Sequence, residues 1–358
     1  MGETFEFGLY TFGELTPDVE TGKAIDARQR IADILAAAKL ADAAGLEVFA
    51  VGEHHRLDMA ISATPVVLAA IAATTKNIRL ASAVTILSTA DPVRVFEDFA
   101  TVDLISGGRA EIIAGRGAFT ESFPLFGYDL ADYDNVFAEK LELLIKLNGA
   151  ERVTWQGRFR TPLNDAEIPP RPAQGRLPIW LGTGGTPGSV ERAGALGLPL
   201  ALANISLPPA QLAPLAALYR RAGANAGHDA KELKISIATH MHIAENSQAA
   251  LRAFYPYYAG YFRHHAATQY RAREITPADY ENLAAPHGPL FVGSPQQIVD
   301  KILYERELFG HQRFLAQIDI GGLPFAQTAR VIELFATKVA PAIRREVGYS
   351  TPARPTAT

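Results

Sequence analysis

The sequence predicts an α/β protein, namely a (β/α)8 barrel with insertions after the fourth and seventh strands. Short apolar runs alternate with helix-length segments from end to end, as parallel strands joined by crossover helices require. We count about eight of each, which is the number of repeats in such a barrel. The chain has no internal repeat and no low-complexity run. A doubly wound open sheet is the competing architecture, because periodicity alone does not decide whether a sheet closes.

The amino-terminal half supplies four expected strands, at residues 5–10, 46–52, 78–86 and 109–114. The helices expected between them cover residues 24–44, 64–75 and 92–105. Apolar side chains recur at helical spacing in the first helix, which ends at Gly45, a residue suited to a helix C-cap. Pro92 suits the first turn of the third helix, because its missing N–H needs no partner there.

The carboxyl-terminal half supplies the other four strands, at residues 178–182, 198–203, 234–242 and 313–320. The helices expected in this half cover residues 135–147, 187–196, 208–226, 295–309 and 324–343. Residues 155–159 are interpreted as a small surface hairpin. The proline-rich stretch 162–178 is interpreted as part of an insertion, because a strand of the same pattern follows it directly.

These elements predict one barrel domain over residues 1–345, with insertions at about 115–178 and 249–290 and a C-terminal tail at 346–358. The second insertion is longer than a crossover helix needs and rich in aromatic and histidine residues. We expect it to cap the catalytic face of the barrel.

Composition excludes several classes of protein. The balance of 34 basic and 38 acidic residues gives a net charge of −4, which offers no reason to expect a nucleic-acid partner. The sequence contains no cysteine, which excludes disulfides, thiolate metal ligands and cysteine nucleophiles. The first ten residues lack the pattern of a signal peptide, and no apolar run approaches the roughly 18 residues of a membrane span. We therefore expect a soluble, cytoplasmic protein with no membrane partner.

A loop of small and hydroxyl-bearing residues follows the fifth strand. Gly184, Gly185, Thr186 and Ser189 lie between that strand and the next helix, where backbone N–H groups and the helix dipole favour an anion. The loop lacks the dinucleotide spacing, because Pro187 stands where the third glycine would fall, and it lacks the lysine of a P-loop. The sequence predicts a phosphate cradle, and an ordinary glycine-rich turn is the alternative.

Arg116 follows the fourth strand and is flanked by glycines. A guanidinium without bulky neighbours offers a planar, multidentate donor to a phosphate, although alone it could equally be a surface salt-bridge partner. Together with the loop after the fifth strand, it indicates a phosphorylated cofactor over the barrel mouth.

Histidines occur at two strand ends. His54 and His55 directly follow the second strand, on the face where barrel enzymes carry their catalytic residues, and a structural hydrogen bond is the alternative role. His240, His242 and Asp319 could contribute to a divalent metal site. No other strand end offers an obvious further ligand, so we favour ordinary barrel histidines and predict no metal site.

Several motifs agree in order and spacing with one family. They are Ala44 to His55, Ile78 to Val84, Thr89 to Arg94, Glu97-Asp98, Asp103 to Arg109, Gly115 to Gly117 and Val292 to Ile298. Each motif alone is weak, but the ordered set is specific and runs over nearly the whole chain. The sequence resembles the bacterial luciferase-like flavin-dependent monooxygenases.

The resemblance implies that reduced FMN binds at the carboxyl ends of the strands. It assigns His54 to the catalytic histidine beside the isoalloxazine ring and Arg116 to the arginine at the FMN phosphate. The residues matched to the cofactor site are Ala83, Val84, Arg116, Ala118, Gly184, Gly185, Thr186 and Ser189. The Ala83–Val84 bond matches a non-proline cis peptide under the flavin. Gly115 stands where some luciferases carry a reactive cysteine, which argues against bioluminescence.

The activity that the resemblance implies is a two-component monooxygenase, in which a separate flavin reductase supplies FMNH2 and O2 is used to oxygenate a small organic substrate. An F420 (deazaflavin)-dependent oxidoreductase is the first alternative. A metal-dependent barrel hydrolase and a non-catalytic flavin-binding protein are further alternatives. The resemblance also favours a homodimer packed through the early helices. Candidates for an apolar lid over the site are Phe119, Phe123, Tyr257, Tyr258 and Tyr261.

Overall fold

Eight parallel strands close into a barrel in the computed structural model, which describes residues 5–266 and 274–348. Each strand pairs with the next around the ring, and the last pairs with the first, so the closed barrel is confirmed and the open sheet is wrong. In ring order the strands are β1 (Glu6–Thr11), β2 (Val48–Val51), β3 (Arg79–Ser82), β5 (Ala110–Gly115), β8 (Ile179–Thr183), β9 (Leu200–Ala203), β10 (Ile235–Ile243) and β12 (Arg313–Gln317). A further short strand, β4 (Thr85–Ile86), pairs with β5 just beyond the end of β3.

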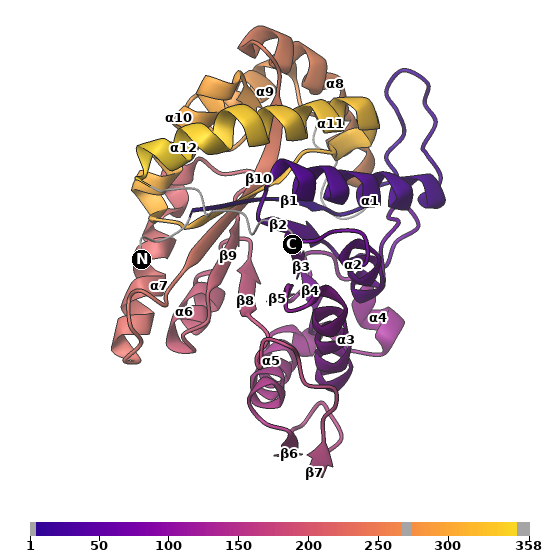
Figure 1. Ribbon diagram of the computed structural model, residues 1–358, viewed down its shortest axis with the longest axis vertical. Coiled ribbons are helices and arrows are strands. Elements are labelled where there is room, and N and C mark those ends of the chain that lie inside the picture. The colour runs from indigo at the N-terminus through magenta and orange to yellow at the C-terminus, as the bar shows by residue number, and fades with distance from the viewer. Residues whose placement is uncertain (1–4, 267–273, 349–358) are drawn as a thin grey trace, which may run out of the picture.

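Helices surround the barrel (Figure 1). They are α1 (Ala27–Ala44), α2 (Thr64–Ala72), α3 (Pro92–Ser106), α6 (Pro187–Ala195), α7 (Pro209–Asn225), α10 (Pro295–Phe309), α11 (Phe325–Leu334) and α12 (Ala340–Glu346). Gly45 adopts φ 81° after α1, the left-handed conformation expected of a C-cap. The single helix predicted at 324–343 is interrupted by a π-helical turn, Phe335–Val339, between α11 and α12.

The connection between β5 and β8 contains α4 (Ser122–Phe126), a short 3-10 turn (Leu130–Asp132), α5 (Tyr133–Gly149) and an antiparallel pair, β6 (Arg152–Trp155) and β7 (Leu163–Glu167). The predicted hairpin at 155–159 is therefore wrong in its bounds, since most of those residues connect the strands. The Glu139 carboxylate accepts the backbone N–H groups of Arg158 and Phe159, which holds this connection against α5. The β6–β7 pair projects at the bottom of the view, far from α8 and α9 at the top (Figure 1).

The connection between β10 and β12 contains α8 (Ser247–Ala266), α9 (Pro277–Ala284), β11 (Phe291–Gly293) and α10. Strand β11 was not predicted from the sequence; it has three residues and pairs with the end of β10 outside the closed ring. Helix α8 reaches the mouth of the barrel, because the ring of Tyr261 lies 5.9 Å from that of His240. Residues 267–273 of the predicted insertion and 349–358 of the predicted tail lie outside the described residues.

The barrel interior forms its own small apolar cluster, separate from the main core between strands and helices. Its buried members are Tyr10, Val48, Ala50, Ala81, Ile113, Trp180 and Leu315. Below them, at the amino ends of the strands, Arg313 forms ion pairs with Glu111 and Glu6, each at 2.7 Å. Within the described residues, no helix is both long and apolar enough to span a bilayer.

Candidate functional site

Arg116 and Thr186 meet at the barrel mouth, although 70 residues separate them in sequence. Nη2 of Arg116 donates to Oγ1 of Thr186 at 3.1 Å, and Nη1 forms an ion pair with Asp134 at the start of α5. The guanidinium also lies over the ring of Tyr133, 5.1 Å from its centre. The side chain of Arg116 is 18% exposed and that of Asp134 is 70% exposed, so Arg116 lies in the wall of the site and Asp134 at its solvent edge.

The loop before α6 has the features of an anion cradle. Oγ1 of Thr183 accepts the backbone N–H groups of Gly185 and Thr186, at 3.2 and 3.3 Å, and so fixes the turn. Gly185 adopts φ 106°, a conformation that favours glycine. A Cβ built on Gly184 would meet no atom within 4 Å, so the backbone is open on that side. Ser189 is buried in the first turn of α6, where backbone N–H groups point toward the loop.

Three glycines make room for the Ala83–Val84 peptide, which is cis as the resemblance implies. A Cβ at Gly115 would lie 2.6 Å from Cγ2 of Val84, and one at Gly182 would lie 2.7 Å from Cγ1 of Val84. A Cβ at Gly52 would lie 2.9 Å from the carbonyl oxygen of Ala83. These glycines lie at the carboxyl ends of β2, β5 and β8. The Val84 side chain occupies the space beside Gly115 and Gly182, and the Ala83 carbonyl group occupies the space beside Gly52.

His54 lies between two aromatic rings at the end of β2. Its ring is 4.9 Å from that of Phe12 and 5.3 Å from that of Phe119, both in edge-on arrangements. Its backbone N–H donates to the carbonyl oxygen of Ile61 at 2.9 Å, and the residue is only 8% exposed. Ala118, directly before Phe119, is exposed. The arrangement places an imidazole at the mouth, in surroundings that largely exclude water.

His55 has the structural role that the sequence analysis kept as an alternative. Its Nε2 lies 2.9 Å from Oε1 of Glu53, and the other oxygen of Glu53 accepts the backbone N–H of Ile86 at 3.0 Å. Glu53 therefore ties the loop after β2 to β4, and of the two adjacent histidines only His54 lies between the aromatic rings.

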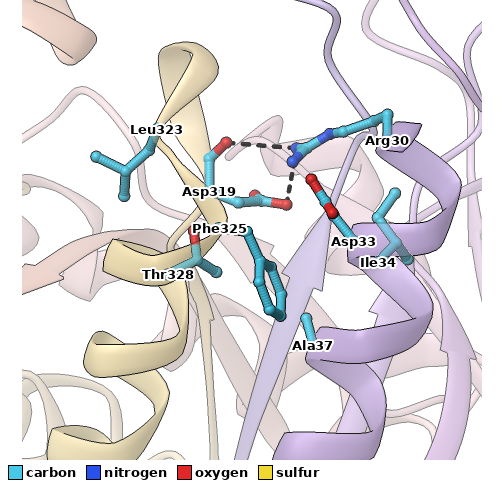
Figure 2. A pocket seen from close by; sticks show the side chains of 8 residues that line it. All are labelled: Arg30, Asp33, Ile34, Ala37, Asp319, Leu323, Phe325 and Thr328. Atoms are coloured by element: carbon cyan, nitrogen blue, oxygen red, sulfur yellow. Dashed lines mark hydrogen bonds and ion pairs between the residues drawn. The ribbon is translucent and has the colours of Figure 1, made fainter. Parts of the chain in front are cut away.

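The residues considered for a metal site have other surroundings. Burial lowers the pKa of His240 to about 3 and that of His242 to about 4, and the ring of His242 stacks on Phe254 at 4.9 Å. The Asp319 carboxylate accepts a hydrogen bond from Arg30 at 2.8 Å, as Figure 2 shows. Across residues 5–266 and 274–348, no three His, Cys, Asp or Glu side chains gather as metal ligands would.

A buried polar cluster at the mouth was missed by the sequence analysis. Nε2 of Gln317 donates to Oε1 of Glu14, and Arg30 donates to both Glu14, at 3.3 Å, and Asp319. Burial raises the pKa of Glu14 to about 7, and Asp319 adds to the shift. A cavity of about 10 Å³ beside Arg30 and Asp319, between α1 and α11, has room for about one water molecule (Figure 2). The available signal was position, because Glu14 follows the end of β1 and Gln317 ends β12.

The aromatic residues proposed as a lid divide into two groups. Phe119 contacts His54, and Tyr258 and Tyr261 contact His240. Phe123 is instead fully buried and stacks on Tyr133, and Tyr257 packs in the apolar cluster of α8 and α9.

Comparison with known proteins shows the family of this chain. A family model described as luciferase-like monooxygenase matches residues 5–312. The chain is 23% identical, over 361 aligned residues, to the oxygenase component of flavin-dependent trigonelline monooxygenase from Acinetobacter baylyi. That alignment covers 94% of this chain and 95% of the relative.

Solved structures share the fold over nearly the whole chain. Monooxygenase RslO1 from Streptomyces bottropensis has a TM-score of 0.81 and 26% identity, covering 94% of this chain and 99% of that one. The oxygenating constituent of 3,6-diketocamphane monooxygenase from Pseudomonas putida, a complex with FMN, has a TM-score of 0.74 and 21% identity, with coverage of 95% and 99%. An F420-dependent secondary alcohol dehydrogenase has a TM-score of 0.73 and 16% identity, with the same coverage. The last two similarities show the fold alone.

Proposed function

Because the chain belongs to the luciferase-like monooxygenase family, we propose that it is the oxygenase of a two-component, FMN-dependent monooxygenase. A separate flavin reductase supplies the reduced FMN, and O2 is used to oxygenate a small organic substrate. The observation that carries the proposal is the contact between Arg116 and Thr186. It joins the two loops that the sequence predicted separately as phosphate-binding, and a phosphate there would meet a guanidinium, a hydroxyl and a helix start together.

The residues at the mouth fit FMN. The phosphate would be held by Arg116, the backbone N–H of Gly184 and the hydroxyl groups of Thr186 and Ser189. The backbone N–H groups of Gly185 and Thr186 would exchange Oγ1 of Thr183 for phosphate oxygens. The isoalloxazine ring would lie on the Ala83–Val84 peptide, where Gly115 and Gly182 contribute no side chain and Val84 contributes the only one among the three. Ala118 would lie at the solvent-exposed edge of the ring site. When bound, reduced flavin supplies the electrons and the oxygen chemistry.

The protein's own residues would bind the cofactor, orient the His54 imidazole and shield the site from water. Phe12 and Phe119 hold the His54 imidazole edge-on and keep water from the site. We propose His54 as the catalytic histidine, which would exchange a proton with the reacting groups at a ring nitrogen. Candidate substrates are aldehydes, ketones, sulfonates and alkane-like compounds.

The test compares two variants in binding and in turnover. We expect Arg116→Ala to weaken FMN binding by at least about tenfold, because it removes a charge-assisted contact to the phosphate. We expect His54→Ala to leave binding within about threefold and to lower FMNH2-dependent oxygenation by about a hundredfold, as loss of a general acid or base does. Fluorescence titration measures binding, and the amount of oxygenated product formed from a candidate substrate measures oxygenation. Arg152→Ala, in the exposed β6–β7 pair, is the matched control. Equal losses of binding in the two site variants would contradict the assigned roles.

A deazaflavin-dependent oxidoreductase is the second candidate, favoured by the fold shared with the F420-dependent dehydrogenase. Anaerobic titration of the protein with reduced FMN and with reduced F420 separates the two. Tighter binding of F420, with hydride transfer and no oxygen consumption, would replace the FMN proposal.

We also propose a homodimer formed through the early helices. Val66 on α2 and Leu104 and Ile105 on α3 are 68%, 49% and 51% exposed, which favours a partner for this surface. Light scattering coupled to size-exclusion chromatography measures the mass. A monomer at micromolar concentration would contradict the proposal.

A further inference from the structure

Two neighbouring buried side chains at the barrel mouth carry polar atoms without partners. His240 and Gln317 are register partners on β10 and β12, and they are 1% and 0% exposed. Neither ring nitrogen of His240 has a hydrogen-bond partner in the described structure, nor does Oε1 of Gln317. Buried polar groups in folded proteins nearly always have hydrogen-bond partners, so three such atoms on neighbouring strands require an explanation.

Both side chains belong to the mouth that carries His54. Gln317 is in register with Tyr10 on β1, whose ring lies 5.4 Å from Phe12, and Phe12 in turn contacts His54. In the ring of strands, β10, β12 and β1 lie across from β3, β5 and β8, which carry Val84 and the two phosphate-binding loops. The unpaired atoms therefore lie on the wall facing the proposed cofactor platform, where a substrate would contact the protein.

The surroundings of these two residues select against an anion. Tyr258 and Tyr261 cover the His240 ring, and Tyr10 and Glu14 lie beside Gln317. Glu14 and Asp319 share a single cation, Arg30, so the cluster has no free positive charge to offer. Burial keeps the imidazole of His240 neutral by lowering its pKa, so the ring offers one N–H donor and one acceptor nitrogen.

We propose that His240 and Gln317 bind an uncharged carbonyl-containing group of the organic substrate, with a carboxamide as the best match and a ketone as the simpler one. An N–H of His240 would donate to the carbonyl oxygen, and the amide N–H of a carboxamide would donate to Oε1 of Gln317. The inference rests on the proposed function. Among the candidate substrates it favours aldehydes and ketones over sulfonates and alkane-like compounds, and it adds carboxamides to them.

The experiment uses three probes of similar shape, namely benzamide, acetophenone and benzoate, which differ in charge and in donors. Full-length protein labelled with ¹⁵N-histidine is titrated with each probe by NMR, with and without FMN, and His240→Phe assigns the His240 ring signals. We expect benzamide and acetophenone to shift the His240 ring nitrogens and benzoate to bind at least about tenfold more weakly. His240→Phe should weaken benzamide binding by at least about tenfold.

His311→Phe is the matched control. His311 is also 1% exposed and its pKa is lowered to about 3, mainly by burial, but it packs on Phe5 at the amino end of the barrel. Its replacement should leave probe binding unchanged. If His240→Phe does not fold, the shifts of the wild-type signals decide the question, with His311→Phe and the other histidine variants used for assignment.

Three results would overturn the proposal: His240 signals that do not move, benzoate that binds as tightly as benzamide, or no probe that binds at millimolar concentration. All of these results are binding measurements, so they do not depend on enzymatic turnover. A His240-dependent benzamide response without FMNH2-dependent oxygen consumption would reject the monooxygenase and keep the binding site, whereas oxygenation without the response would do the reverse.

Discussion

The two ends of the barrel differ in how their buried charged and polar side chains are paired. At the amino end, Arg313 makes two hydrogen bonds to Glu111, at 2.7 and 3.2 Å, one to Glu6 at 2.7 Å, and lies over Trp180 at 4.2 Å. At the carboxyl end, His240 and Gln317 are just as buried, and three of their polar atoms have no hydrogen-bond partner among the described residues. The charged groups at the amino end therefore stabilise one another, whereas we propose that the unpaired atoms of His240 and Gln317 bind substrate. Unpaired ring nitrogens within the described residues also occur at the amino end, in His311, which packs on Phe5.

The ionisable groups at the two ends of the barrel also differ in their pKa values. Burial alone would lower the pKa of Arg313, but Glu111 and Glu6 raise it above its ordinary value, so the guanidinium is charged and paired. At the other end, burial raises the pKa of Glu14 toward neutrality despite its contacts with Arg30 and Gln317. One end is therefore a compensated ion network, and the other contains groups whose protonation depends on pH.

The largest expected effect comes from breaking the amino-end network. Arg313→Met would leave Glu111 and Glu6 buried without their main counter-charge, and we expect it to lower the free energy of unfolding by about 3 to 5 kcal/mol. Urea denaturation followed by circular dichroism measures the change. The double variant Arg313→Met/Glu111→Gln should lose less than the single variant, because one uncompensated charge is removed. A loss below about 1 kcal/mol in Arg313→Met would mean that this network contributes little to stability.

A smaller effect is expected at the carboxyl end, where the strand ends are crowded around Val84. Gly115→Ala places a Cβ 2.6 Å from the Val84 side chain, and such overpacking costs about 1 to 3 kcal/mol. Adding Val84→Ala should recover most of the loss in a double-mutant cycle. Gly184→Ala is the control, because its Cβ meets open space and should change stability by less than about 0.5 kcal/mol. Additive losses in Gly115→Ala and Val84→Ala would show that the two positions do not share one space.

A third expected effect concerns the dependence of stability on pH. Because burial raises the pKa of Glu14 from its ordinary 4.5 to about 7, the folded protein binds a proton there more tightly than the unfolded chain does. The stability that this proton provides is fully present below about pH 4.5 and is lost as pH rises toward 7. Glu14→Gln should flatten this part of the stability profile by an amount on the order of 1 to 3 kcal/mol, measured as urea midpoints between pH 4.5 and 7.5. The exposed Glu167→Gln should leave the profile unchanged. A Glu14→Gln profile that parallels the wild type would contradict the shift.

The sequence predicted the barrel, and it predicted that Arg116 and the Gly184–Ser189 loop share its mouth, because these signals are local. Strands and helices appear as periodic runs, and the Gly184–Ser189 loop and Arg116 each follow a predicted strand directly. The Arg30–Asp319 pair joins residues 289 positions apart, and nothing local in either segment indicates the other. The fit of Val84 between Gly115 and Gly182 is likewise a property of three strands meeting, and β11 is too short to show a period.

The ion pair between Arg116 and Asp134 would influence the residence time of a bound coenzyme. If Arg116 binds a phosphate as proposed, it would exchange one anionic partner for another, so it would gain less binding energy than an unpaired guanidinium. Asp134 would return easily to water from its exposed position. The Asp134 carboxylate would re-form its ion pair with Arg116 when the phosphate dissociates, which would ease release of the phosphate as well as its binding. Such a site suits a coenzyme that is shuttled in and out at each turnover, rather than one kept permanently in place.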